Sequence, residues 1–119
     1  MKYSETHEWI EIEGSVGTVG ITRHAEKQLG DIVYVELPKS GKQVKAGEEV
    51  AVLESTKAAA DIYSPVSGTI LEINESLKTR PEWINEDPEK GAWIYKIQLS
   101  DLLEVEKLMD ITSYELLIK

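Results

Sequence analysis

The chain consists largely of short runs of strand-forming residues separated by turns, several of which contain glycine. The runs cover residues 9–12, 16–21, 31–37, 47–54, 60–63, 69–73 and 93–99. Such runs, rich in valine, isoleucine and aromatic residues and bounded by turn-forming residues, are typical of antiparallel strands. Many short strands at this spacing predict a mainly β fold, either a sandwich of two sheets or a flattened barrel, with helices at its periphery.

The first helix is predicted over residues 23–29. Thr22 is a suitable N-cap for it, and Gly30 can end it in a conformation that other residues adopt at a cost.

The segment 77–91 is different, because it contains two prolines and a cluster of charges. These features predict a loop.

Two further helices are predicted near the C-terminus. Ser100 can cap the first of them, whose apolar residues are Leu102, Leu103, Val105, Leu108 and Met109. The second is expected to begin between Asp110 and Thr112. Thr112 and Glu115, three residues apart, match the spacing of a capping box.

Length and composition restrict the class of protein. A chain of 119 residues has the length of one domain, so we expect residues 1–119 to fold as a single unit. It has no cysteine, which excludes disulfides and cysteine-based chemistry. A formal net charge of −9 argues against nucleic-acid binding. No apolar run reaches the length of a membrane span, so we expect no membrane partner and a cytoplasmic location, or an organelle matrix after removal of a transit peptide.

Lys57 lies almost midway between two turn-type glycines, ten residues after Gly47 and eleven before Gly68. Two extended segments of that length place the lysine at the tip of a hairpin, pointing away from any core. The small residues Ala58-Ala59-Ala60 leave space for an enzyme that modifies the side chain. A lysine is usually a solvated surface charge. The spacing alone leaves that interpretation and a prosthetic-group attachment point equally open.

The residues around Lys57 resemble the lipoyl/biotinyl carrier superfamily. The resemblance is carried by Glu-Ser-Thr-Lys-Ala at 54–58 and Ile-Tyr-Ser-Pro-Val-Ser-Gly-Thr-Ile at 62–70. Within that superfamily the whole chain is similar to the H proteins of the glycine cleavage system. The further matches are His7-Glu8-Trp9, Gly20-Ile21-Thr22, Leu29-Gly30-Asp31-Ile32-Val33, Val35-Glu36-Leu37-Pro38, Asn85-Glu86-Asp87-Pro88, Trp93 and Tyr114.

The resemblance implies a specific fold and cofactor. The fold is a barrel-sandwich hybrid of two antiparallel sheets, with a short internal helix, C-terminal helices and the modified lysine at a hairpin tip. The cofactor is lipoate, attached covalently as N6-lipoyllysine at Lys57. Biotin carriers typically have methionine on both sides of their lysine, whereas the neighbours here are Thr56 and Ala58. Biotin is therefore the weaker alternative.

The resemblance also implies the partners. H proteins are non-catalytic carriers and serve as a shared substrate of glycine decarboxylase, an aminomethyltransferase and dihydrolipoamide dehydrogenase. The arm receives the aminomethyl group of glycine, gives up its carbon and is then reoxidised. A lipoate ligase or octanoyltransferase is expected to modify Lys57, and we expect the carrier to be a monomer. Two alternatives stay open: an H-like protein that relays lipoyl or octanoyl groups to 2-oxoacid dehydrogenases, and a β-domain that is never modified.

A resting place for the loaded arm can be predicted as well. An aminomethyl group held through sulfur is cationic and is lost when water reaches it, so a carboxylate within an apolar cleft would hold and protect it. By resemblance, the matching positions are Glu8 and Asp61, with Thr6 nearby. Asp61 lies four residues after Lys57 and hence near the tip, whereas Glu8 depends on the resemblance alone. Without the resemblance, both acids are ordinary surface charges.

The sequence offers no other chemistry and some departures from the family pattern. His7 and His24 are the only histidines, and neither has metal-ligand spacing around it, so no metal site and no catalytic residue is predicted. Glu89-Lys90 stands where the family usually has Tyr-Gly, and Ala92 where it has glycine. Trp83 is an apolar residue in a region expected to be exposed. These departures predict an altered docking surface and leave the lysine hairpin intact.

Overall fold

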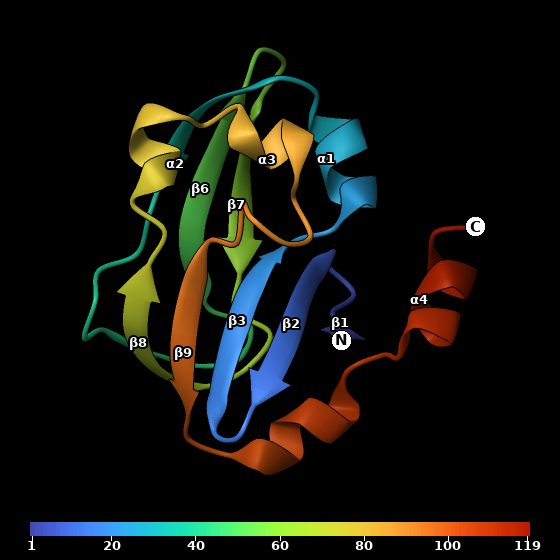
Figure 1. The fold of residues 1–119 in the computed structure, drawn as a ribbon. Helices are drawn as coiled ribbons and strands as arrows, with labels where there is room; N and C mark the ends of the chain where they lie inside the picture. Colours follow the sequence, from blue (N-terminus) through green and yellow to red (C-terminus); the bar gives the residue numbers. More distant parts are fainter.

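Two antiparallel sheets form the body of the computed structural model, which describes residues 1–119. The strands are β1 (Lys2–Tyr3), β2 (Glu8–Glu13), β3 (Val16–Ile21), β4 (Ile32–Glu36), β5 (Gln43–Val44), β6 (Glu49–Ser55), β7 (Ala59–Tyr63), β8 (Gly68–Ile73) and β9 (Tyr95–Leu99). One sheet has six strands in the order β1-β2-β3-β9-β8-β5, and the other has three in the order β4-β6-β7. The sheets are not closed into a barrel, and the predicted mainly β fold with two antiparallel sheets is confirmed (Figure 1).

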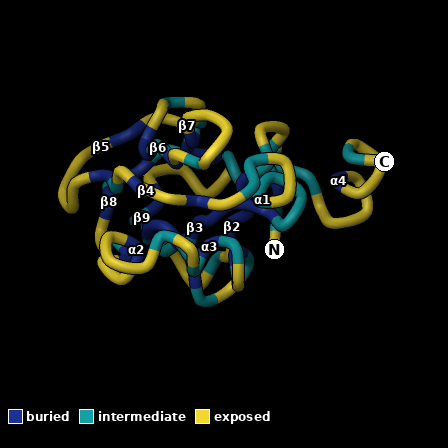
Figure 2. The backbone as a smooth tube through the Cα atoms, turned by 90° about the horizontal axis from the view of Figure 1, so that it is seen from above, coloured by how far each residue is buried: buried dark blue, intermediate teal, exposed yellow.

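The core is formed by apolar side chains from both sheets. Strand β9 shows the alternation clearly, since Tyr95, Ile97 and Leu99 are buried while the residues between them are partly exposed. In Figure 2 the strand segments include most of the buried positions, whereas the C-terminal helix is largely exposed. At Gly68 the strands approach so closely that a Cβ atom would lie 2.0 Å from the carbonyl oxygen of Gln98. Only glycine fits there.

The predicted helix over residues 23–29 is confirmed as α1 (Arg23–Leu29). The Thr22 hydroxyl accepts a hydrogen bond from the amide of Ala25, as an N-cap does. Gly30 ends the helix with φ of 81°, a left-handed value that favours glycine. Helix α1 has no fully buried residue, and it lies beside the upper end of the β6–β7 hairpin (Figure 1).

The loop predicted over residues 77–91 is partly wrong, because this region contains two single-turn helices, α2 (Ser76–Thr79) and α3 (Trp83–Glu86). Each helix has one completely buried apolar residue, Leu77 in α2 and Ile84 in α3. Their burial stabilises turns whose local composition, with its prolines and charges, favours a loop.

The C-terminal segment differs from the prediction in its first helix. It is a 3-10 helix, η1 (Leu102–Lys107), and its cap is Asp101 rather than Ser100. Leu102 and Leu103, two apolar residues of the predicted helix, are 55% and 66% exposed.

The last helix, α4 (Ile111–Leu117), begins where it was predicted. Its cap is Asp110, whose carboxylate accepts a hydrogen bond from the amide of Ser113, so the expected Thr112–Glu115 capping box does not form. The Tyr114 ring stacks on the Tyr3 ring with a centroid distance of 4.7 Å, which joins the two ends of the chain. None of the helices has the length and apolar character needed to span a lipid bilayer.

Candidate functional site

Lys57 lies at the tip of the β6–β7 hairpin and is exposed, as the glycine spacing predicted. The turn is held by Ser55, whose hydroxyl accepts hydrogen bonds from the amides of Lys57 (3.1 Å) and Ala58 (3.2 Å) and donates one to the carbonyl of Ala58 (3.1 Å). The neighbouring Ala58 and Ala59 are also exposed. The lysine therefore stands at an ordered and uncrowded position at one end of the molecule (Figure 1).

The turn that follows α1 lies next to the hairpin tip. The amide of Thr56 donates a hydrogen bond of 3.1 Å to the carbonyl of Asp31. The stem of Lys57 runs over Gly30: a Cβ atom added to this glycine would lie 3.4 Å from Cε and 3.7 Å from Nζ of the lysine. The tip is thus in contact with the α1–β4 connection through both its backbone and the lysine side chain.

A cavity of about 470 Å³ lies at the other end of β7 from Lys57. Its walls include Glu8, Thr6 and Tyr63, together with Tyr3 and Met109 from opposite ends of the chain. The structure therefore places two of the predicted cleft residues, Glu8 and Thr6, in one cavity.

Glu8 is buried, with 1% of the residue's surface exposed. Its Oε1 atom accepts hydrogen bonds from the hydroxyls of Ser4 and Thr6, and its Oε2 atom accepts a longer one of 3.3 Å from the amide of Tyr63. Burial raises the pKa of Glu8 above its ordinary value, and these hydrogen bonds oppose the shift. Because an ionised carboxylate has about four lone-pair sites, Glu8 can still accept a donor from a cationic ligand.

Asp61 does not line the cavity. It lies in the middle of β7 opposite Val52, and its side chain is exposed. Side chains alternate between the two faces of a strand, so Ala59, Asp61 and Tyr63 share the outer face of β7. This face leads from the lysine turn to the cavity wall at Tyr63, a strand distance of about 20 Å from Lys57 at about 3.3 Å per residue.

His7 lies directly beside Glu8 in a turn with φ of 73°, unusual for a residue other than glycine. Its Nδ1 atom is 2.8 Å from the hydroxyl of Tyr114, which also bonds the Thr22 hydroxyl at 2.7 Å. The His24 ring lies at a centroid distance of 4.8 Å. Burial, and secondly the neighbouring His24, lower the pKa of His7. These contacts give His7 a structural role beside the cavity, and no group of acidic or histidine residues forms a candidate metal site.

The departures near residue 90 have structural partners inside the molecule. The carboxylate of Glu89 accepts a hydrogen bond of 2.8 Å from the amide of Arg23 at the start of α1. Ala92 is 1% exposed and belongs to the core. Trp83 is partly buried, packs against the core and lies close to Gly91. Much of this region thus contributes to internal packing.

Several residues of the cavity were not predicted from the sequence. Ser4 and Tyr63 supply hydrogen bonds to Glu8, and Lys107, Leu108 and Met109 form a wall. No short motif marks these residues, because they come from three distant parts of the chain. The Tyr3–Met109 backbone pairing brings the two ends together at this cavity.

Comparison with known proteins gives a consistent result. A family model described as "Glycine cleavage H-protein" matches residues 1–119. The glycine cleavage system H protein of Thermotoga maritima is 57% identical over 114 residues, which cover 96% of this chain and 92% of that protein. A probable glycine cleavage system H protein of Sulfolobus acidocaldarius is 53% identical over 117 residues, covering 98% and 85%. The crystal structure of a glycine cleavage system H protein from Mycobacterium marinum superposes with a TM-score of 0.86 at 38% identity, covering 95% of this chain and 91% of that one.

Proposed function

The chain belongs to the glycine cleavage H-protein family, and we propose that Lys57 is the residue to which its lipoyl group is attached. The resemblance found in the sequence is thereby confirmed, and with it the role of lipoyl carrier in glycine cleavage. The position of Lys57 carries the proposal: it is exposed at the tip of a hairpin in a chain matched by the family from end to end.

The residues around Lys57 fit an attached lipoyl group. The Ser55 hydroxyl holds the turn without covering the lysine, and the flanking alanines have small side chains. Attachment through an amide removes the lysine charge, which has no acidic partner among the ion pairs of the structure. When bound, the group supplies a ring disulfide that accepts an aminomethyl unit and two electrons. The protein's own contribution is to present this arm and to shelter what it holds.

The cavity at Glu8 is the proposed resting place of the arm. A buried carboxylate that still has free lone pairs suits a cationic amine, since it balances the charge within a cavity that is lined partly by apolar side chains. Thr6 and Ser4 orient this carboxylate through their hydroxyls. Asp61 is proposed to interact with the arm along the outer face of β7, outside the cavity itself.

Membership of the family implies enzyme partners within the glycine cleavage system. We propose that these are glycine decarboxylase, the aminomethyltransferase and dihydrolipoamide dehydrogenase, and that a lipoate ligase or octanoyltransferase modifies the lysine. Tethering raises the effective concentration of the carried group at each of these enzymes. The chain acts in this proposal as one non-catalytic domain and as a monomer, and its bacterial relatives favour the cytoplasm.

The attachment is tested by intact-mass measurement of the protein made in a lipoate-competent host. We expect one lipoyl-sized addition, absent from a Lys57→Arg variant that keeps the charge and the fold. A Lys45→Arg variant, which changes another exposed lysine, serves as the control and should be modified like the wild type. An unmodified wild-type protein would contradict the proposal.

A further inference from the structure

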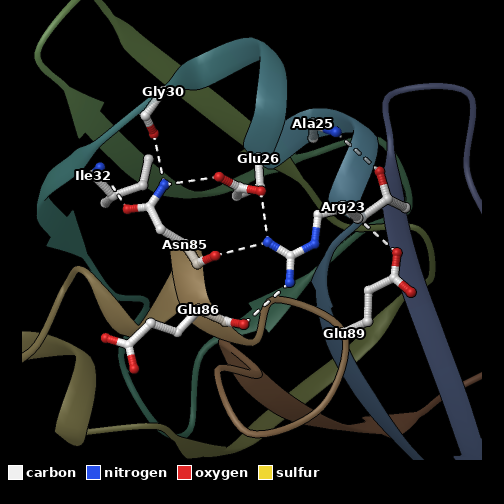
Figure 3. A network of polar contacts seen from close by, with 9 residues as sticks. Arg23, Ala25, Glu26, Gly30, Ile32, Asn85, Glu86 and Glu89 are labelled. Carbon is white, nitrogen blue, oxygen red and sulfur yellow. Dashed lines mark hydrogen bonds and ion pairs between the residues drawn. The ribbon is translucent and has the colours of Figure 1, made fainter.

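We propose that Asn85 is a positioning residue for the modification of Lys57, acting through the turn between α1 and β4. The proposal rests on the attachment at Lys57 described above and assigns a role to residues well separated from it in the sequence. Figure 3 shows the contacts that carry it, in which the Asn85 side chain lies between α3, the end of α1 and the start of β4.

The side chain of Asn85 holds both ends of a three-residue turn. Its Nδ2 atom donates a hydrogen bond of 2.8 Å to the carbonyl of Gly30, and its Oδ1 atom accepts one of 2.9 Å from the amide of Ile32. An asparagine amide can donate and accept at the same time, so one side chain satisfies both backbone groups. The residue between them, Asp31, is thereby fixed in orientation.

Asn85 is itself held by α1. Its Nδ2 atom donates a second hydrogen bond of 3.0 Å to the carboxylate of Glu26, and its carbonyl accepts one of 2.7 Å from Arg23. Arg23 also donates to the carbonyl of Glu86 and forms an ion pair of 2.7 Å with Glu26. Asn85, Arg23 and Glu26 therefore form a clamp that joins α1 and α3 to the turn and has little freedom to move (Figure 3).

The clamped turn supports the lysine in two ways. The Asp31 carbonyl accepts the Thr56 amide at 3.1 Å and so fixes the backbone one residue before Lys57. The lysine stem also lies over Gly30, whose φ of 81° is a conformation that favours glycine. Asn85 thus acts on Lys57 through Gly30 and Asp31, without touching it.

Acyl transfer to the lysine requires its Nζ atom to meet an activated carbonyl in a defined geometry. A misplacement of about 1 Å can slow such a step by about a hundredfold. A lysine on a loose turn samples many orientations, whereas a lysine whose turn and stem are both held offers few. The clamp is therefore expected to raise the rate at which a lipoylating enzyme modifies Lys57.

The test compares Asn85→Ala with Asn74→Ala. Asn74 is a matched control because it also uses its Nδ2 atom to hold backbone carbonyls, those of Gly91 (3.1 Å) and Trp93 (2.8 Å), away from the lysine turn. Two quantities are measured on the unmodified proteins at equal folded fraction. One is amide hydrogen exchange at Thr56 by NMR, and the other is the single-turnover rate of lipoyl transfer to Lys57 by a lipoate ligase, followed by intact mass.

We expect Asn85→Ala to accelerate Thr56 exchange and to slow lipoyl transfer by about tenfold or more, since even a partial misplacement is costly. Asn74→Ala should stay near the wild type in both measurements. A Gly30→Ala variant, which is strained at φ of 81°, should loosen the same turn and also slow transfer. Wild-type transfer rates in Asn85→Ala, or equal losses in both asparagine variants, would overturn the inference. Failure of the wild type to accept the lipoyl group would instead overturn the attachment at Lys57, while Thr56 exchange still reports on the clamp.

Discussion

The role of Glu8 is best tested by replacing it with glutamine. Glu8→Gln keeps the volume of a side chain that is 1% exposed, and the glutamine Oε1 atom can still accept the Tyr63 amide while its amino group faces the hydroxyls of Ser4 and Thr6. The substitution therefore removes the negative charge and leaves the local hydrogen bonds satisfied. Any change in the lifetime of the cargo, the aminomethyl group on the lipoyl arm, then reports on the negative charge of Glu8.

The expected size of the effect follows from the contact that the cationic amine of the aminomethyl group would make with Glu8. The amine is cationic in both proteins, so the substitution removes only its attraction to the opposite charge. An opposite charge within about 4–6 Å favours a charged group by about one to three pKa units, each about 1.4 kcal/mol. The lower end of this range corresponds to a change of about tenfold in the fraction of time that the arm spends outside the cavity. Since water attacks the cargo mainly outside the cavity, we expect Glu8→Gln to shorten its lifetime by about the same factor.

The assay loads the lipoylated protein with the aminomethyl group and follows its loss by intact mass at neutral pH. Glu5→Gln is the control, because Glu5 is an exposed carboxylate on the same cavity wall and its removal changes the net charge equally. Glu5→Gln should keep the wild-type lifetime. Equal lifetimes for Glu8→Gln and the wild type would refute the reasoning and remove Glu8 from the site.

Two other measurements address stability. Burial raises the folded-state pKa of Glu8, so the contribution of its protonated form to stability is fully present below the unfolded pKa of about 4.3 and is lost as pH rises through the folded pKa. The free energy of unfolding of the wild type relative to Glu8→Gln, from urea titrations, should therefore fall over that pH range and stay flat above it. A difference that rises with pH would contradict the direction of the pKa shift. Gly68→Ala places a methyl group 2.0 Å from the Gln98 carbonyl oxygen and should lower the free energy of unfolding by roughly 1–3 kcal/mol. Gly14→Asn, in an open left-handed turn, should change this free energy little. Equal stabilities of the two variants would show that the strands move to accommodate the methyl group.

Local sequence was sufficient where a segment's own residues decide its structure. Thr22 and Gly30 bracket α1 correctly, and the spacing of Gly47 and Gly68 places Lys57 at its hairpin tip. Leu77 and Ile84 were assigned to a loop, because the one-turn helices that contain them are stabilised by a core formed from distant strands. The strands β1 and β5, two residues each, are too short to give a period and were missed.

The candidate site shows the same contrast between local and distant contacts. Lys57 could be predicted because hairpin geometry is local, but the walls of the cavity could not. Tyr63 contacts Glu8 across a separation of 55 residues, and no local pattern records such a contact; Ser4 is only four residues from Glu8, but no motif marks it. Asp61 is near the lysine in sequence and shares the outer face of β7 with Tyr63, but it lies two residues before the cavity wall, so proximity to the lysine did not place it in the cavity.

The cavity beside Glu8 has one consequence for the synthesis of the protein. Tyr3 and Met109 exchange two backbone hydrogen bonds of 2.8 Å, and residues from both ends of the chain form the walls. Met109 leaves the ribosome long after Tyr3, and contacts of such large sequence separation form late and slowly. The lysine hairpin, by contrast, is complete well before Met109 has emerged. We expect a nascent chain to present the lysine well before it has a shelter for the cargo.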